Sequence, residues 1–519
     1  MSRRHRTSLL EFTLLATPAA LIAAAVLVSG CGPRTSLPRP HAVWVMGVDA
    51  PAYDPDGPPD PRRAAIERLL TRGLVEEDST GHVVPVAANR IEVSPDSLLY
   101  TFHLRPGLRF TDGSSCGSDV FRDALRAGLG RSDHSTRRWQ LASVRGVDAV
   151  RAGRPLPVLG IETPDSMTLA LRLSTPDRLL LGRLALPGTT AAWKVREAGS
   201  WRTAIGLGPM IVLRADSLRG LELVKARSPF ARVELADTLT LRFVPSSARV
   251  RALVRAGRPD LVWPLPPEFL NEPVPAAYRR VAQVARPERW LLLVMRADLP
   301  PTTKLPARHA LGHGINRAEL LRALGAGASE TGAWVPGAPA FDFPRLDPQE
   351  IELWRDRGKL GRSFHVVMAY DAYGPAAEIA RQMQGEWSAH SMYVELMPLT
   401  GARRQAEFLS GRAHLVLADV QELAGDPAAL LATLVMPFRG PAVGPVRTGW
   451  RTRDFDPWLM PSRRSAAWDP SWVERRLEEE RVVLPLARLP WVWLERAAGP
   501  VAPFDPRFGP ECPSPSVPR

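Results

Sequence analysis

Apolar and polar residues alternate from Leu98 to Arg105, which predicts a β-strand with one buried face. A Pro-Gly pair ends this strand, and a second turn follows at Asp112-Gly113. Apolar residues then recur at helical spacing between Val120 and Leu129, with Ser118-Asp119 placed before them as a predicted helix N-cap. The pattern predicts a strand, a turn and a helix, which make a scaffold that specifies no ligand by itself.

A second patterned region, residues 364–418, predicts further strands around one helix. Apolar runs of strand length cover residues 364–370, 393–396 and 414–418, and between the first two an apolar residue recurs every fourth position at Ile379, Met383 and Trp387. Two strands joined through a helix run parallel with a right-handed crossover. The region is therefore interpreted as a βαβ unit followed by another strand.

Parallel sheets place ligands just beyond the carboxyl ends of their strands. That rule selects Tyr370, Asp371 and Tyr373 after one strand and Asp419 after another. The alternative is that these are ordinary loop and cap residues. As a set they are the best site that the residue pattern alone predicts.

The N-terminus has the pattern of an export signal. Three arginines precede an apolar run from Phe12 to Val28, and Val28-Ser29-Gly30-Cys31 places small residues before a cysteine, which resembles a bacterial lipobox. The sequence thus predicts a lipoprotein signal peptide at 1–30, lipid attachment at Cys31 and a proline-rich tether at 31–40. An uncleaved transmembrane anchor is the alternative, because the run approaches the ~20 residues that span a bilayer.

The composition limits the number of domains and the class of partner but does not indicate a function. The mature chain is longer than one hydrophobic core usually holds, so two or three domains are expected. The formal net charge is +13. The densest arginine cluster lies at residues 249–258 and forms the polar side of a predicted amphipathic helix, whose apolar side is formed by Val250, Leu253 and Val254. No known nucleic-acid-binding module accompanies the charge, so no nucleic acid is predicted as a partner. Only Cys116 and Cys512 follow Cys31, and their pairing stays open.

The strand–turn–helix region carries a motif of one known family. The family 5 solute-binding proteins, receptors of ABC importers, share an L-R-x-G-x-x-F-x-D-G pattern that is met here by Leu104, Arg105, Gly107, Phe110, Asp112 and Gly113. Other segments that resemble the family are Gly206-Leu207-Gly208-Pro209, Asp260 in a G-x-x-D segment, and Ile315-Asn316-Arg317. The resemblance extends over nearly the whole mature chain.

The resemblance implies an α/β, two-lobed periplasmic-binding-protein fold of class II, with the extra subdomain of peptide receptors and a hinge between lobes. It implies a first lobe at 41–283, a second at 284–479, and a C-terminal return to the first at 480–519. The expected function is the extracytoplasmic substrate-binding component of an ABC importer, lipid-anchored to the cell membrane, monomeric, without cofactor or metal, and not an enzyme. A peptide-like or other small solute and the importer's permease are the expected partners.

The resemblance also extends the list of ligand-site candidates. Asp426-Pro427 resembles the family's D-P after a late strand, and peptide receptors carry an aspartate for the ligand's α-ammonium four residues before that proline. Leu423 stands there instead, so the usual amine anchor is missing unless Glu422 or Asp419 replaces it. Trp263 and Trp334 are further candidates, because they lie in loops where family members line the cleft; they would otherwise be core aromatics. Tyr53 completes the candidates, in a segment that stands in the place of the family's L-D-P.

Three other functions are weighed. An envelope sensor or scaffold on the same fold would lack the transport step. A serine hydrolase is suggested only by Gly113-Ser114-Ser115-Cys116-Gly117, which fits G-x-S-x-G but lies inside the family's D-G turn. His309 and His313 share a helix face as metal ligands can, but the residues between them lack the glutamate of zinc proteases.

Overall fold

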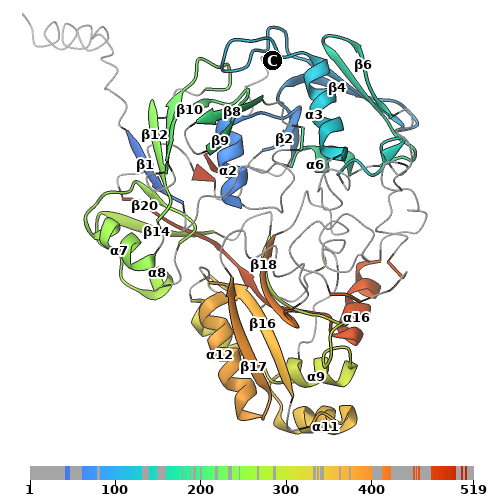
Figure 1. Cartoon of the computed structure of the whole chain (residues 1–519), viewed down its shortest axis with the longest axis vertical. Helices are drawn as coiled ribbons and strands as arrows, with labels where there is room; N and C mark the ends of the chain where they lie inside the picture. The colour runs from blue at the N-terminus through green and yellow to red at the C-terminus, as the bar shows by residue number, and fades with distance from the viewer. Residues whose placement is uncertain are drawn as a thin grey trace, which may run out of the picture. The chain divides into compact units, whose positions relative to one another are not determined.

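The structure is a computed structural model of the chain, and its described part forms several sheets with helices packed against them (Figure 1). The residues it describes are 41–46, 61–78, 82–130, 140–147, 149, 159–177, 179–186, 189–190, 194–198, 201–216, 220–231, 236–244, 246–265, 268–283, 288–325, 327–330, 335, 338, 344–361, 364–372, 376–399, 412–421, 448–450, 452, 454–455, 469–497, 504–505 and 509–510. Residues 1–40, which hold the predicted leader and tether with Cys31, lie outside this part.

A seven-stranded mixed sheet contains both the first and one of the last strands of the described chain. Its order is β10 (Met210–Asp216), β11 (Gly220–Lys225), β12 (Thr238–Arg242), β1 (Ala42–Val45), β13 (Leu261–Val262), β20 (Trp491–Arg496) and β14 (Tyr278–Gln283). Strand β1 runs parallel to β12 and β13, whereas β20 runs antiparallel to β13 and β14. Helix α2 (Pro61–Leu70) shares a buried cluster with this sheet that includes Trp491 and Trp493.

A five-stranded sheet holds the predicted βαβ unit. Its order is β17 (Tyr393–Leu399), β16 (His365–Asp371), β18 (Leu415–Gln421), β15 (Arg289–Met295) and β19 (Val483–Leu489). Strands β16 and β17 are parallel and flank helix α12 (Ala376–Ala389), so the βαβ prediction is confirmed. Ile379, Met383 and Trp387 are fully buried in one cluster with residues of these strands. Figure 1 shows α12 alongside β16 and β17. The 3.6-residue period was therefore a correct guide to the core.

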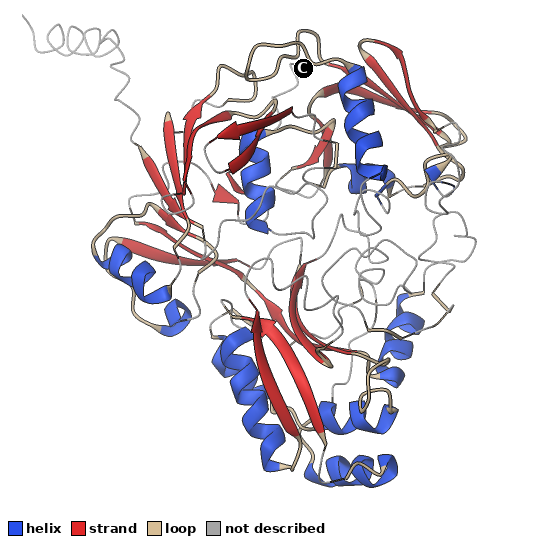
Figure 2. Cartoon of the chain, in the orientation of Figure 1, coloured by secondary structure: helices blue, strands red, loops and turns tan. Residues whose placement is uncertain are grey.

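A four-stranded antiparallel sheet carries the family-like motif. Its order is β4 (Ala88–Val93), β5 (Leu99–Leu104), β7 (Thr168–Arg172) and β6 (Ile161–Asp165), and Figure 2 shows these strands in red beside helix α3 (Ser118–Gly130). Tyr100, Phe102 and Leu104 point into its core, as the alternation predicted. Ser118, the predicted N-cap, is the first helical residue instead, and its hydroxyl donates to the carbonyl of Asp165.

The motif itself is scaffold. Gly107 and Gly113 have φ of +72° and +87°, a left-handed region that favours glycine, and they form the two turns after β5. The Asp112 carboxylate accepts hydrogen bonds from the amide and hydroxyl of Ser114, which lowers the pKa of Asp112. Phe110 is buried in the same core as Leu104. These contacts explain why the pattern requires its residue types without assigning any of them to a ligand.

The remaining elements are short. The two-stranded sheets are β2 (Val75–Glu77) with β3 (Val83–Pro85), β8 (Lys194–Ala198) with β9 (Trp201–Ile205), and β21 (Phe504–Asp505) with β22 (Gly509–Pro510). The other helices are α6 (Leu180–Leu184), α7 (Ser247–Arg255), α8 (Glu268–Asn271), α9 (Leu305–His313), α10 (Arg317–Leu324), α11 (Pro348–Gly358) and α16 (Pro470–Glu480). Helix α7 buries Val250 and Val254, while Arg251 on it pairs with Glu272, as expected for an amphipathic helix.

The loop at Thr448-Gly449-Trp450 is docked tightly against the end of β15. The amide of Ala297 donates to the carbonyl of Thr448 at 2.6 Å, and Gly449 has φ of +63°. A Cβ added at Gly449 would lie 2.1 Å from Cγ of Asp298, whose carboxylate is held by the Arg296 guanidinium at 2.6 and 2.7 Å. The side chain of Asp298 therefore cannot yield without breaking that ion pair.

Replacement of Gly449 by alanine is expected to lower the free energy of unfolding by about 2 kcal/mol, because it combines steric overlap with an unfavourable φ. Gly385→Ala is the matched control: Gly385 lies inside α12 with nothing within 4 Å of a Cβ, so alanine should be neutral or stabilising by up to about 1 kcal/mol. Urea titration of both variants measures the difference. Equal stability of the two would contradict the docked loop.

Candidate functional site

The carboxyl ends of β16 and β18 lie side by side at one edge of the five-stranded sheet. The strands are parallel, with Tyr370 opposite Leu417, so Asp371 and Asp419 both fall at this edge. Asp419 is exposed and Asp371 half-buried. Tyr370 is only 7% exposed and belongs to the core cluster beneath the sheet. Both aspartates thus lie at this edge, but strand alternation places Asp419 on the face of Leu417 and Asp371 on the opposite face with Ala369, while the Tyr370 side chain contributes mainly to the core.

Asp419 is engaged by an arginine from the neighbouring strand. Strand β15 runs antiparallel to β18, which sets Arg289 at the same edge as Asp419. The Arg289 guanidinium donates from Nε to Oδ1 of Asp419 at 3.3 Å and from Nη2 to Oδ2. Its Nη1 donates to the carbonyl of Pro490 at 3.0 Å, and its charged carbon lies 4.5 Å from the centre of the Trp491 ring. Arg289 thus links the candidate edge to the residues between β19 and β20.

Trp263 lies in the other large sheet. It follows β13, its amide donates to the carbonyl of Val45 at 2.9 Å, and its side chain is 2% exposed in the buried cluster with Trp491. The peptide bond to Pro264 is cis. Trp263 thus stands near the carboxyl ends of the parallel strands β1 and β13, but its ring is packed in the core.

The other predicted ligand residues, Tyr53, Trp334, Tyr373, Glu422 and Asp426, lie outside the described residues, as does Leu423. The edge formed by Asp371, Asp419 and Arg289 is therefore the part of the candidate site whose geometry is known. The sequence pattern missed Arg289. A signal was present, because Arg289 is the single charged residue at the start of the otherwise apolar strand 290–295.

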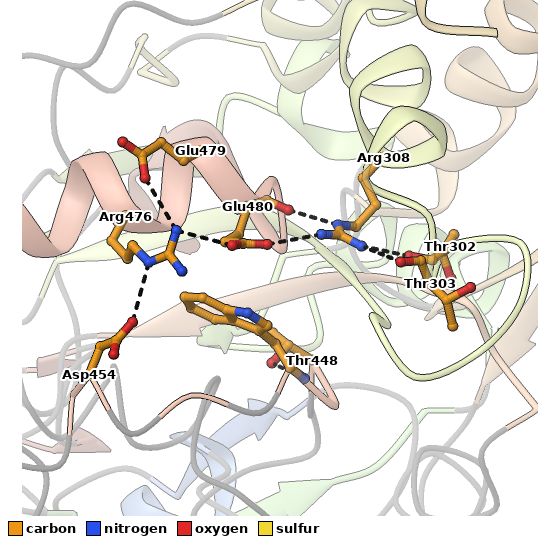
Figure 3. Close-up of polar contacts among 9 residues, drawn as sticks. Thr302, Thr303, Arg308, Thr448, Asp454, Arg476, Glu479 and Glu480 are labelled. Atoms are coloured by element: carbon orange, nitrogen blue, oxygen red, sulfur yellow. Dashed lines mark hydrogen bonds and ion pairs between the residues drawn. The ribbon is translucent and has the colours of Figure 1, made fainter. Parts of the chain in front are cut away.

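A network of side-chain contacts around helix α16 holds Trp450, Asp454 and Phe455 in place. Figure 3 shows the polar contacts of this region. Arg476 on α16 forms ion pairs with Asp454 at 3.4 Å, Glu479 at 3.2 Å and Glu480 at 3.0 Å, and its guanidinium carbon lies 5.4 Å from the centre of the Trp450 ring. Phe455 packs edge-on against both Trp450 and Trp472. These residues are thereby tied to a helix that contacts β19.

Arg308 extends the same network to α9. Its side chain, 3% exposed, donates to the backbone carbonyls of Thr302, Thr303 and Glu480 at 2.8, 3.2 and 2.7 Å (Figure 3). Burial lowers the pKa of Arg308, and the nearby Glu480 carboxylate opposes that shift. A buried guanidinium that satisfies carbonyls at a helix end stabilises the fold. We therefore assign this network to structure rather than to ligand.

His309 and His313 are packed rather than poised for a metal. The His309 ring stacks on Trp354 at 4.1 Å, and the two imidazole centroids are 6.5 Å apart. Burial lowers the pKa of His309 to about 4, with Arg481 and Arg308 adding repulsion. Among the described residues no group of three or more His, Cys, Asp or Glu is arranged to hold a metal ion.

The G-x-S-x-G segment lacks the geometry of a nucleophile. The Ser114 hydroxyl is engaged by Asp112 and Lys194, and Ser115 makes a strand bridge to Arg109 within the turn. Within the described chain, no histidine hydrogen-bonds to Ser115. Cys116 is a free, buried thiol whose pKa is raised to about 12 by burial, so it is not the reactive thiolate that covalent catalysis needs.

Comparison with known proteins identifies the family of this chain. Residues 82–440 match the family model of the bacterial extracellular solute-binding proteins, family 5, over its middle region. The chain belongs to the family 5 extracellular solute-binding proteins. Members of this family bind solutes outside the cytoplasm and are not enzymes, so this chain is a substrate-binding component of an ABC importer and works in the periplasm or an equivalent extracytoplasmic space.

Two relatives illustrate the range of similarity. The glutathione-binding protein GsiB of Salmonella paratyphi A is 23% identical over 481 residues, which are 89% of this chain and 85% of that protein. Di/tripeptide-binding protein 4 of Pseudomonas aeruginosa is 31% identical over 129 residues, 24% of each chain.

Solved structures show the fold. The Escherichia coli murein tripeptide binding protein MppA has a TM-score of 0.73 at 16% identity, covering 91% of this chain and 96% of that one. Haemophilus influenzae OppA in complex with RPPGFSPFR also has a TM-score of 0.73, at 15% identity, covering 91% and 98%. The expected mixed α/β periplasmic-binding-protein fold is confirmed. No helix among the described residues is long and apolar enough to cross a membrane.

The pKa of His309 predicts a pH dependence of stability. An unfolded chain protonates this imidazole near pH 6.5, whereas the folded chain resists protonation until about pH 4, so the unfolded state binds more protons between these values. The free energy of unfolding should therefore fall as pH drops from 6.5 to 4, by on the order of 1 kcal/mol after allowance for partial exposure of the ring.

Urea titrations at pH 6.5, 5.5 and 4.5 test this expectation. His309→Gln should reduce the dependence without abolishing it, because burial also lowers the pKa of His313 and His414. His365→Gln, which alters an exposed histidine on β16, should change the slope less than His309→Gln does. A slope that His309→Gln does not alter would show that other groups govern the acid sensitivity.

Proposed function

We propose that this family 5 protein is a lipid-anchored receptor for short peptide-like solutes, which it delivers to the permease of its importer. The names of its relatives and structural neighbours point to this ligand class: glutathione, di- and tripeptides, a murein tripeptide and an oligopeptide. Binding requires no covalent step. The ligand stabilises one arrangement of the protein by its differential affinity for two states.

The two-lobe organisation, with lobes at 41–283 and 284–479 and a return at 480–519, is part of this proposal. The strand connections support the first boundary, because the chain passes from the seven-stranded sheet to the five-stranded sheet between Gln283 and Arg289. The return to the seven-stranded sheet begins later than residue 480, because β19 still pairs within the five-stranded sheet and the chain passes back at Pro490, the single residue between β19 and β20. Few and short connections between two sheets are typical of hinge motion.

The ligand is proposed to bind at the carboxyl edge of β16 and β18, where the half-buried Asp371 and the exposed Asp419 stand. Tyr53, Trp263, Trp334, Tyr373, Glu422 and Asp426 are retained as candidates around it. Asp419, the nearest described replacement for the missing amine anchor, already has a counter-ion in Arg289. A free α-ammonium would therefore find little uncompensated negative charge at Asp419.

The single observation that carries the ligand assignment is this paired carboxylate at the predicted edge. Leu423 supplies no carboxylate at the position where peptide receptors have one. We infer that the receptor recognises the amide groups of its ligand rather than a free α-amine.

Calorimetry with matched peptides tests the inference on the amine. Free di- to pentapeptides and their N-acetylated forms should bind with similar affinity, because an uncompensated ammonium–carboxylate contact would otherwise contribute on the order of 3 kcal/mol, or about a hundredfold. Submicromolar binding of free peptides that acetylation abolishes would contradict it. Oligosaccharides serve as the control for a ligand that lacks peptide groups.

The lipid anchor rests on the lipobox-like segment that ends at Cys31. Cys31→Ser is expected to stop lipid attachment, so that the protein is released to the soluble fraction or retains its leader. Detergent partitioning and intact mass measure both outcomes. If the variant partitions as the native protein does and keeps its leader, the apolar run is a transmembrane anchor instead.

A further inference from the structure

We propose that Arg289 sets the charge selectivity of the ligand site by neutralising Asp419. This inference rests on the proposed function, because it assumes that a peptide-like solute binds at the edge that carries Asp419. It assigns to Arg289 a specificity-determining role and to the site a preferred chemical class, namely uncharged amide-bearing groups.

The Arg289 guanidinium is held in place on three sides. Nε and Nη2 face the Asp419 carboxylate, Nη1 donates to the Pro490 carbonyl, and one face of the group lies over the Trp491 ring. Three of its five N–H donors are thus used, and two of these three already face a carboxylate. It also cannot leave Asp419 without losing the contacts to Pro490 and Trp491. Arg289 is therefore a fixed counter-ion and not a mobile one.

Asp419 remains accessible while paired. Its side chain is 33% exposed, against 17% for Arg289, so a ligand that reaches this edge meets the carboxylate before the guanidinium. A carboxylate has about four acceptor sites, and Arg289 occupies only part of them. A ligand N–H can therefore still hydrogen-bond to Asp419. An ammonium group would also meet the nearby positive charge of Arg289, which cancels much of its attraction to Asp419.

A contribution to folding stability does not by itself explain the ion pair between Arg289 and Asp419. The Asp419 carboxylate is one-third exposed, and ion pairs that remain in contact with solvent contribute modestly to folding. A second pair, between Arg488 and Glu288 at 2.5 Å, already joins β19 to the residue before β15. The pair that involves Asp419 differs because one member stands at the edge where ligand is proposed to bind. Removing either member should shift selectivity, and the two removals should shift it in opposite directions.

The test uses two probes, tri-alanine amide with a free N-terminus and its N-acetylated form, so that both carry an uncharged C-terminus. Calorimetry on the mature protein gives the ratio of the Kd of the acetylated probe to that of the free probe. For the native protein a ratio near one is expected. Arg289→Met exposes the Asp419 charge and should raise the ratio about tenfold, as for a hydrogen bond between charged groups.

Asp419→Asn leaves the Arg289 charge unpaired and should lower the ratio several-fold, because the free ammonium is then repelled. The double variant has neither charge and should return the ratio to about one. Arg488→Met is the matched control, since it shortens a neighbouring arginine that pairs with Glu288 and not with Asp419; its ratio should equal that of the native protein.

The outcomes separate the inference from the function on which it rests. If the native protein binds both probes and the ratio stays within about threefold in both single variants, Arg289 does not set selectivity and only this inference fails. If one single variant fails to fold, the other still decides the sign. If the native protein binds neither probe, the peptide ligand class is wrong and the inference falls with it.

Discussion

Pro490, the single residue between β19 and β20, limits how far the two large sheets can move apart. Strand β19 ends at Leu489 within the five-stranded sheet, and β20 begins at Trp491 within the seven-stranded sheet. A connection of one residue leaves neither strand free to move far from the other at this point. The Cβ of Gly327, if present, would lie 3.1 Å from the Pro490 ring, so the connection is closely packed as well. Each sheet can tilt about this connection but cannot separate from it.

Arg289 acts at the same place. It begins β15, the first strand of the five-stranded sheet in the chain, and it contacts Pro490 and Trp491, the first residue of β20. The geometry that joins the two sheets therefore also fixes the charge next to Asp419. Other arginines make similar intramolecular contacts: Arg308 donates to the carbonyl of Glu480 at the end of α16, and Arg496 holds Asp260 at 2.6 Å. These arginines thus support the fold locally.

Local patterns predicted the elements whose packing follows a simple period. Strand β5 and helix α12 were recognised because their buried faces recur every second and about every fourth residue. The pairing of β15 with β18 and β19 could not be recognised in this way, because nothing within one strand specifies a partner more than a hundred residues distant. The N-cap expected at Ser118 was wrong for a related reason: its hydroxyl donates to Asp165, a partner that local sequence does not reveal.

In the candidate site, too, the sequence pattern predicted some residues and missed another. The rule for parallel strands selected Asp371 and Asp419, and the structure brings them to one edge. Arg289 was missed because its contact with Asp419 depends on sheet register across 130 residues.

The most direct test of the account is a crystal structure of the protein with the solute that co-purifies with it. The account predicts ligand density in contact with the edge formed by β16 and β18, with Asp419 still paired to Arg289. Ligand density that leaves this edge empty and binds elsewhere would contradict it.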